Sequence, residues 1–246
     1  MPNADLMTQR LQQIADHSVG LLRSLYRQSG LRPHFNNEQR LKRIIVHKSP
    51  HLDEYVADWL LMACLKDNPS SFGYLEQSLF SLTNDHVAES LWPSSVLIGF
   101  GAREHRLPRP LCYYDEHLDH GKRKTRSAAR LVYNDFFGNS RQSPPLGVRL
   151  ILQENDLIDS QGGGHSLHLG NLIKLLHTSR LLINRGGIVG NEQMPAIWKR
   201  AVVFGCLASV AFLINESGRW IDDGVVMKET LGRIVEKLRK SEAAAT

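Results

Sequence analysis

The chain has 246 residues, of which 42% are hydrophobic, and this is enough for one sizeable α/β core or two small domains. The formal net charge of +5 at pH 7 is too small to identify a ligand class, although it is compatible with an anionic substrate. Three widely spaced cysteines without a CxxC spacing exclude a disulfide framework and a zinc knuckle, and they predict reduced thiols in a cytoplasmic protein. These are Cys64, Cys112 and Cys206.

The first predicted element is a helical extension over residues 1–40. Its start has no basic segment followed by an apolar one, so no signal peptide is expected. Apolar side chains recur from Leu6 to Leu25 as an imperfect helical stripe, and Gly30 and Pro33 end it. This segment could wrap the core or bind a partner subunit, so a homo-oligomer is compatible with the sequence.

The next part of the chain alternates between strand and helix patterns. Residues 43–46 predict a short buried strand, and residues 53–65 predict a helix that follows it after a polar turn. Strand, turn and helix are the opening of a βαβ unit, so we expect an α/β domain with a parallel sheet and flanking helices over residues 41–160. A second helix is expected at about residues 72–82. Two more strands are predicted at the apolar runs 94–101 and 111–114.

The second half of the chain predicts mainly helices. The segment SAARLVYNDFF stops at Gly138, and a glycine just past the last periodic residue is a normal end for a helix. An apolar run over residues 201–214 is short for a membrane span and suits a buried core helix, so no membrane is expected. We therefore expect a mainly helical C-terminal part over residues 161–246. Helices are predicted at residues 148–159, 166–178, 195–215 and 225–240.

Side chains that can bind metal ions cluster directly after two of the predicted strands. In a parallel α/β sheet, ligands collect at the carboxyl ends of the strands. A third group of carboxylates ends a predicted helix. Imidazole and carboxylate groups together suit manganese, zinc, magnesium or iron better than a soft metal. The three clusters consist of His47, His51, Asp53 and Glu54, then Asp115, Glu116, His117, Asp119 and His120, and finally Asp156 and Asp159.

These motifs resemble those of a known family. His47, His51 and Asp53 have the spacing of the first motif of the DHH phosphoesterase superfamily, and YYDEHLDHG is similar to its DHH motif in degraded form. SAARLVYNDFFG resembles the helix that follows this motif in the Myg-one-like exonucleases, formerly called metal-dependent protein hydrolases. DLIDSQG, which starts at Asp156, and the tail RWIDDGVVMKETLGRIVEKL are also similar to that branch. The resemblance covers roughly residues 43–240.

The resemblance implies a DHH-like fold and a metal-dependent phosphoesterase, a nuclease that acts on RNA or short oligonucleotides. Such enzymes use divalent ions to activate water and to neutralise charge on the phosphoryl group. Manganese is the expected ion, with magnesium or zinc as alternatives. His117 and Asp115 are the catalytic candidates, and Asp115 would orient a neighbouring imidazole. The implied metal ligands are His47, His51, Asp53, Glu116, His117 and Asp156.

Some of these residues also have plain structural interpretations. Glu54 is an acid in the first turn of a helix, where the helix dipole favours negative charge in any protein. Asp156 and Asp159 could cap a helix end or pair there instead of binding metal. Both interpretations stay open at the level of the sequence.

A basic run, HGKRKTRSAAR, lies between the second metal motif and a predicted helix. Its cations, together with the amide groups at the helix start near Thr125 and Ser127, could bind the phosphates of RNA, of an oligonucleotide or of another phosphate-bearing ligand. Such binding would be sensitive to salt. The alternative is a solvated basic loop. The candidates for phosphate binding are His120, Lys122, Arg123, Lys124 and Arg126.

The sequence departs from the family pattern at the second motif, where an acid normally ends a strand and bridges two ions. Ile98 or Gly99 stands there, and no carboxylate occurs between Glu89 and Glu104. Two ions without a bridging carboxylate would repel each other, so three hypotheses stay open. The first is an active nuclease. The second is a catalytically degenerate protein that binds nucleic acid or nucleotides or has a regulatory role, and the third is a small-molecule phosphatase of the pyrophosphatase type.

Overall fold

The computed structural model of the protein divides into two units, and each is described here by itself. The helical unit comprises Met1–Leu25, Pro145–Ile151 and Ser166–Thr246, and the sheet unit comprises Tyr26–Pro144 and Leu152–His165. The structure describes residues 4–31, 41, 43–46, 50–65, 94–99, 112–115, 127–137, 142–161, 171 and 196–243.

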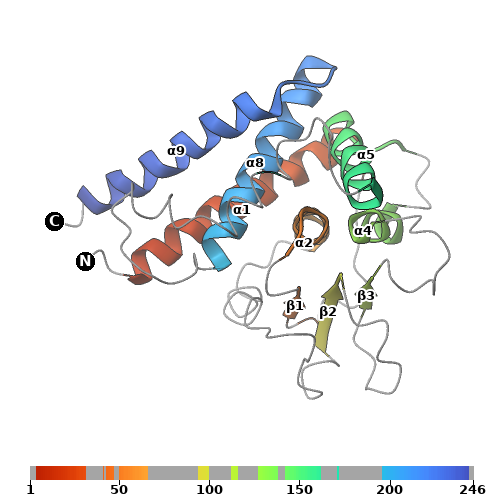
Figure 1. Cartoon of the computed structure of the whole chain (residues 1–246), viewed down its shortest axis with the longest axis horizontal. Coiled ribbons are helices and arrows are strands. Elements are labelled where there is room, and N and C mark those ends of the chain that lie inside the picture. The colour runs from red at the N-terminus through yellow and green to blue at the C-terminus, as the bar shows by residue number, and fades with distance from the viewer. Residues whose placement is uncertain are drawn as a thin grey trace. The chain divides into compact units, whose positions relative to one another are not determined.

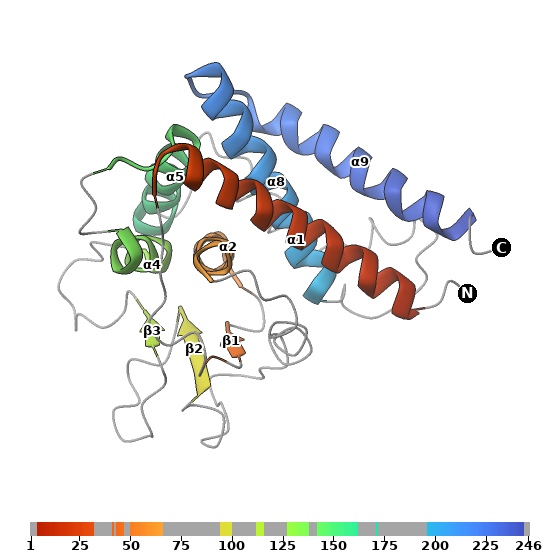
Figure 2. The same ribbon diagram turned by 180° about the vertical axis from the view of Figure 1, so that it is seen from behind.

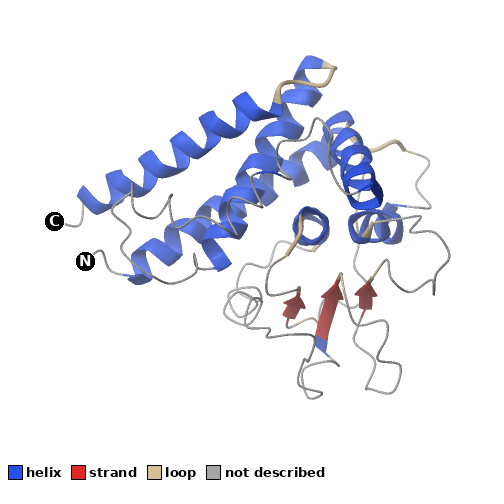
Figure 3. Ribbon diagram, in the orientation of Figure 1, coloured by secondary structure: helices blue, strands red, loops and turns tan. Residues whose placement is uncertain are grey.

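The described strands of the sheet unit form a small parallel sheet (Figures 1 and 3). Strands β1 (Arg43–Ile45), β2 (Ser95–Ile98) and β3 (Cys112–Tyr114) lie in the order β1-β2-β3. Ile45 pairs with Leu97, and Ile98 pairs with Tyr114. All three strands fall within runs that the sequence predicts, and their parallel pairing confirms the expected mixture of sheet and helix.

Helix α2 (Leu52–Cys64) forms the centre of the sheet unit. Every one of its residues is buried, and Trp59 and Leu61 are completely enclosed. The helix packs against β2 and against α4 (Ala128–Phe137), and both helices lie over one face of the sheet (Figure 1). Burial on all sides explains why the segment is almost continuously apolar. The three acids of this helix, Asp53, Glu54 and Asp58, are nevertheless buried, which is rare for carboxylates.

The helical unit contains most of α1 (Ala4–Gln28), together with α8 (Ala196–Ser217) and α9 (Asp223–Ala243), which Figure 2 shows from behind. Helices α8 and α9 pack against each other, and Gly205 allows the approach, because a Cβ there would lie 3.2 Å from Cδ1 of Ile234. Helix α5 (Leu146–Gln161) contributes its first residues to this unit. A Cβ at Gly147 would lie only 2.0 Å from the backbone oxygen of Ala211, so glycine is required there.

Helix α8 is the core helix of the helical unit. By length and composition Trp198–Ser217 could cross a membrane, but 67% of that segment is buried within the protein, as in core helices of soluble proteins. The guanidinium of Arg200, itself buried, lies 5.0 Å from the ring centre of Phe204 and makes a cation–π contact. Burial agrees with the prediction of a core helix over residues 201–214.

The units group the chain differently from the three consecutive parts that the sequence suggests. Most of α1 belongs to the same unit as the C-terminal helices α8 and α9. A helix is found at each predicted segment that corresponds to α1, α2, α4, α5, α8 and α9. The helix expected at residues 72–82 lies outside the described residues, as does nearly all of the one expected at residues 166–178.

Candidate functional site

The three described strands end at one edge of the sheet. Their parallel pairing puts Val46, Gly99 and Asp115 in succession directly after β1, β2 and β3, and the Gly99 N–H donates to the Tyr114 carbonyl at 2.8 Å. This edge is where a parallel sheet normally carries its ligand site. Both predicted metal motifs begin here, because His47 follows Val46 in the sequence and Glu116 follows Asp115.

The predicted site residues divide into two groups. His51, Asp53, Asp115 and Asp156 are described, and the contacts of Asp53 and Asp156 are given below. Asp115 is buried at the end of β3. The others lie outside the described residues, and their roles stay predictions: His47, Glu116, His117, His120, Lys122, Arg123, Lys124 and Arg126.

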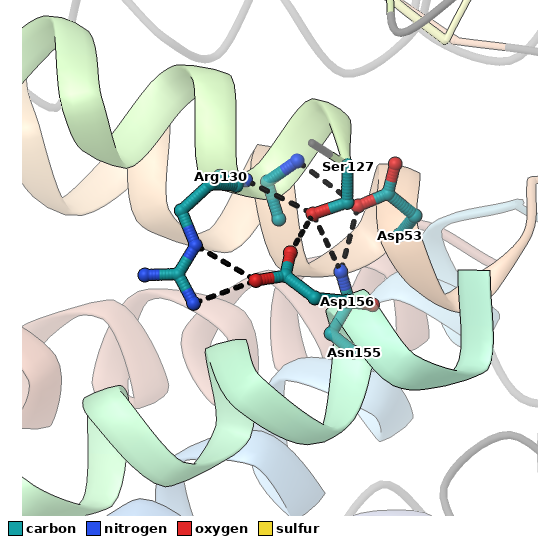
Figure 4. Close-up of polar contacts among 6 residues, drawn as sticks. Asp53, Ser127, Arg130, Asn155 and Asp156 are labelled. Carbon is teal, nitrogen blue, oxygen red and sulfur yellow. Dashed lines mark hydrogen bonds and ion pairs between the residues drawn. The ribbon is translucent and has the colours of Figure 1, made fainter. Parts of the chain in front are cut away.

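Asp53 reaches from the first turn of α2 to the start of α4. Its buried carboxylate accepts hydrogen bonds from the backbone N–H of Ala128 at 2.7 Å and of Ala129 at 2.9 Å. It also accepts one from Nδ2 of Asn155 at 2.8 Å (Figure 4). The first amides of a helix have no partner within it, and the helix dipole favours a negative charge at this end. Asp53 therefore acts as an internal anion that ties α2 to α4 and α5.

Ser127 caps α4 and joins the same network. Its Oγ accepts hydrogen bonds from the Arg130 N–H and from Nδ2 of Asn155, both at 3.1 Å, and donates to Oδ1 of Asp156 at 2.6 Å. Oδ2 of Asp156 accepts from Nε of Arg130 at 2.9 Å and lies 2.7 Å from its Nη2 (Figure 4). Asp156 is therefore paired with a guanidinium group and a hydroxyl group.

This network occupies backbone amides that were predicted to bind phosphate. The sequence suggested that amides at the start of this helix could bind phosphate, but those of Ala128, Ala129 and Arg130 already have acceptors within the protein. A phosphate at the same place would have to displace the Asp53 carboxylate or the Ser127 hydroxyl group. These three amides are therefore not available to a phosphate bound by the preceding basic run.

Two of the predicted metal ligands, Asp53 and Asp156, have described contacts. Oδ1 of the Asp53 carboxylate accepts two hydrogen bonds and Oδ2 accepts one. A ligand held by such donors is typical of metal sites. Asp156 forms an ion pair with Arg130, and its role as a metal ligand stays a prediction. Within the described part of the chain no group of three or more His, Cys, Asp or Glu side chains is arranged to hold an ion.

Asn155 is a residue of this network that sequence reasoning missed. Its Nδ2 is the donor toward Asp53, because a carboxylate only accepts, and its buried Oδ1 has no hydrogen-bond partner among the described residues. Along α5 the buried residues Val148, Leu152 and Asn155 follow a helical period. An asparagine on an otherwise apolar stripe is the signal that could have identified it, because a buried amide requires partners.

At the end of β2, the side chain of Glu54 fills the space beside Gly99. Gly99 has a positive φ of 79°, and a Cβ on it would lie 2.7 Å from both Cγ and Oε1 of Glu54. Oε2 of Glu54 accepts a hydrogen bond from the His51 N–H at the start of α2 and lies 3.7 Å from Nδ1 of the His51 ring. The His51 side chain is 83% exposed and that of Glu54 only 4%.

The aromatic end of β3 is held by a separate contact. The Tyr114 hydroxyl group donates to Oδ2 of Asp135 on α4 at 2.7 Å, and burial raises the pKa of Tyr114 far above its usual range. Burial also raises the pKa of the Cys112 thiol on the same strand. Both groups therefore stay protonated at neutral pH, and the Tyr114 hydroxyl group positions β3 against α4.

Comparisons of the chain with protein-family models, with curated proteins and with solved structures find no match. The fold and the site define a mixed α/β protein with a small parallel sheet and a polar cluster beside the carboxyl ends of its strands. The resemblance to the DHH superfamily stays a prediction from the sequence.

Proposed function

We propose that the protein is a DHH-like, metal-dependent phosphoesterase that acts on RNA or short oligonucleotides. One observation supports this most: β1, β2 and β3 are parallel neighbours, so the segments that start with Val46, Gly99 and Asp115 leave the sheet at the same edge. The residues expected to bind metal follow in two of these segments. In parallel α/β sheets this edge carries the ligand site.

The residues have distinct roles in this proposal. A divalent ion, with manganese expected, supplies an activated water and neutralises charge on the phosphoryl group. Asp53, held by α4 and Asn155, and His51, with its exposed imidazole, are the described ligands. His47, Glu116 and His117 would complete the set, and Asp115 would orient His117 for proton transfer. Lys122, Arg123, Lys124 and Arg126, with His120, would bind substrate phosphates through their side chains.

Metal analysis and substrate assays of the purified full-length protein test the proposal. We expect about one or two divalent ions per chain, as in one- and two-metal hydrolases, and a marked loss of metal in the His51→Ala variant. His17→Ala, which removes an exposed histidine from α1 in the helical unit, is the control and should keep its metal. Labelled RNA, single-stranded DNA and pyrophosphate, incubated with manganese, then identify the substrate. Cleavage of pyrophosphate alone would favour the small-molecule phosphatase.

A second function is favoured by a specific observation. Asp156 is paired with Arg130, and Gly99 instead of an acid follows the last residue of β2, Ile98, so the protein could keep the fold and bind nucleic acid or nucleotides without cleaving them. In that case the protein binds oligonucleotides equally well with and without EDTA, and every substrate stays intact across metals and pH. That result would contradict the enzyme proposal and support the binding protein.

A further inference from the structure

We infer that the end of the α8–α9 pair at which the two helices meet is a surface that binds a second copy of this chain. This apolar tip consists of Phe212 and Leu213 on α8, Trp220 and Ile221 in the connection, and Val225 on α9. It lies in the helical unit and shares no residue with the candidate site, so the inference goes beyond the proposed function and does not depend on it.

The apolar tip gathers most of the exposed apolar side chains in the described part of the chain. Five large apolar side chains are exposed there, and three of them belong to the tip: Phe212 and Leu213, each 38% exposed, and Val225, which is 54% exposed. Trp220 and Ile221, between them in the sequence, are partly exposed. Single apolar side chains on a surface are normal, but several at one place mark a site of interaction.

The geometry of the two helices brings these residues together. Helix α8 ends at Ser217 and α9 begins at Asp223, where the two helices meet (Figure 1). A helix rises about 1.5 Å per residue, so Phe212 lies about 8 Å before the end of α8 and Val225 about 3 Å after the start of α9. Phe212 also follows Gly205 by about two helical turns, and Gly205 is on the face of α8 that packs against α9. The tip residues therefore lie at one end of the helix pair.

The charged side chains around the apolar tip are mixed in sign. Glu216 and Glu229 are exposed acids, and Arg219 and Lys228 are exposed cations. Asp222, a further exposed acid, already accepts hydrogen bonds from backbone N–H groups at the start of α9. The described residues provide no ion-pair partner for the other four side chains. Two copies related by a two-fold axis present the same surface to each other, so the cations of one tip can pair with the acids of the other.

This charge pattern favours a second copy over a membrane. Anionic lipids attract surfaces with clustered cations, and the acids around the apolar tip cancel that attraction. Helix α8 is not available to enter a bilayer as a whole, because 67% of its apolar segment is buried within the protein. The net charge of +5 is small for a chain of this size, so the repulsion between two copies is weak at physiological salt.

The size of the apolar tip determines how strong the complex should be. A stable interface buries about 800 Å² on each partner, and the partly exposed apolar side chains of the tip supply only the centre of such an interface. We therefore expect a weak, reversible dimer with a Kd of about 1–100 µM.

Sedimentation velocity of the full-length protein tests this surface, at concentrations from about 1 to about 200 µM, which include the expected Kd. We expect the fraction of dimer to rise with concentration. Leu213→Ser should dimerise at least about tenfold more weakly, because it removes an apolar side chain from the centre of the interface. Leu157→Ser is the matched control, since Leu157 is a leucine of α5 that is 37% exposed, and it should dimerise as the wild type does. Circular dichroism verifies that each variant is folded.

Exchanging the charges tests whether the two tips face each other. Glu216→Lys combined with Glu229→Lys makes the tip cationic, and Arg219→Glu combined with Lys228→Glu makes it acidic. Each double variant alone should lose at least about tenfold in dimer affinity, because like charges then face each other. A mixture of the two double variants should form heterodimers at least as tightly as the wild type dimerises, most clearly at low salt.

Several results would overturn the inference. A wild type that stays monomeric over the whole range of concentration refutes it directly. If Leu213→Ser weakens the dimer no more than Leu157→Ser does, the dimer uses a different surface. A mixture of the charge variants that stays monomeric contradicts the pairing of the two tips. Monomeric protein that binds vesicles of phosphatidylcholine and phosphatidylserine, and loses this binding in Leu213→Ser, would identify the tip as a membrane-binding surface instead.

Discussion

Asp53 carries the contacts that hold the sheet unit together around α4, and the substitution Asp53→Asn isolates its charge. The side chain keeps its size but replaces one carboxylate oxygen with an NH2 group, which cannot accept hydrogen bonds. The N–H of Ala128, or those of Ala129 and Asn155, would then face a donor in a buried place. The protein therefore loses at least one hydrogen bond to a charged acceptor and the attraction between Asp53 and the α4 dipole.

The expected cost follows from these losses. A hydrogen bond to a charged group contributes about 1.5–3 kcal/mol, and a charge in a partly buried helix-terminus site up to about 2 kcal/mol. Because the two contributions overlap, we expect the free energy of unfolding to fall by roughly 2–4 kcal/mol, a large part of the stability of a typical domain.

Urea denaturation followed by circular dichroism measures this change, and hydrogen exchange at Ala128 and Ala129 locates it. Asp222→Asn is a matched control, since Asp222 also accepts two amides at a helix start, those of Gly224 at 3.0 Å and Val225 at 3.3 Å, but is exposed. Asparagine caps exposed helices as well as aspartate does, so the control should change the stability by less than about 0.5 kcal/mol. Equal effects of the two substitutions would refute the assignment of Asp53 as a buried internal anion.

Two further predictions concern other buried positions. Gly99→Ala places a Cβ 2.7 Å from the Glu54 side chain at a φ of 79°, so we expect thermal unfolding at a lower temperature and a loss of about 1–3 kcal/mol in the free energy of unfolding. Gly218→Ala is the control, because Gly218 has a φ of 69° but no described neighbour within 4 Å, and it should lose less. Burial raises the pKa of the Cys206 thiol from its usual 9.0 to about 12, so the unfolded chain releases this proton first. The stability that this thiol contributes is complete below pH 9 and falls by at most about 1.4 kcal/mol per pH unit as the pH rises toward 12. Urea titrations at several alkaline pH values measure this slope, which should be smaller in Cys206→Ala; an unchanged slope would mean that other groups cause it.

Much of the fold could be predicted from local patterns. The apolar runs at β1, β2 and β3 and the periodic stripes of the described helices are properties of short segments, and each segment forms the predicted element. The grouping of α1 with α8 and α9 was not predicted, because it depends on which apolar helix faces pack against each other. A single sequence indicates that each helix has an apolar face but not which helix it contacts.

At the candidate site, the sequence by itself determined which residue types follow the strands, and it included Asp53 among the candidate residues. Only the tertiary structure decided what these residues contact. Asp53 meets Asn155 across more than a hundred positions of the chain, Asp156 pairs with Arg130, and Glu54 fills the space beside Gly99. Hydrogen bonds and close packing act over a few ångströms, so they depend on how distant segments are brought together, which spacing along the chain does not reveal.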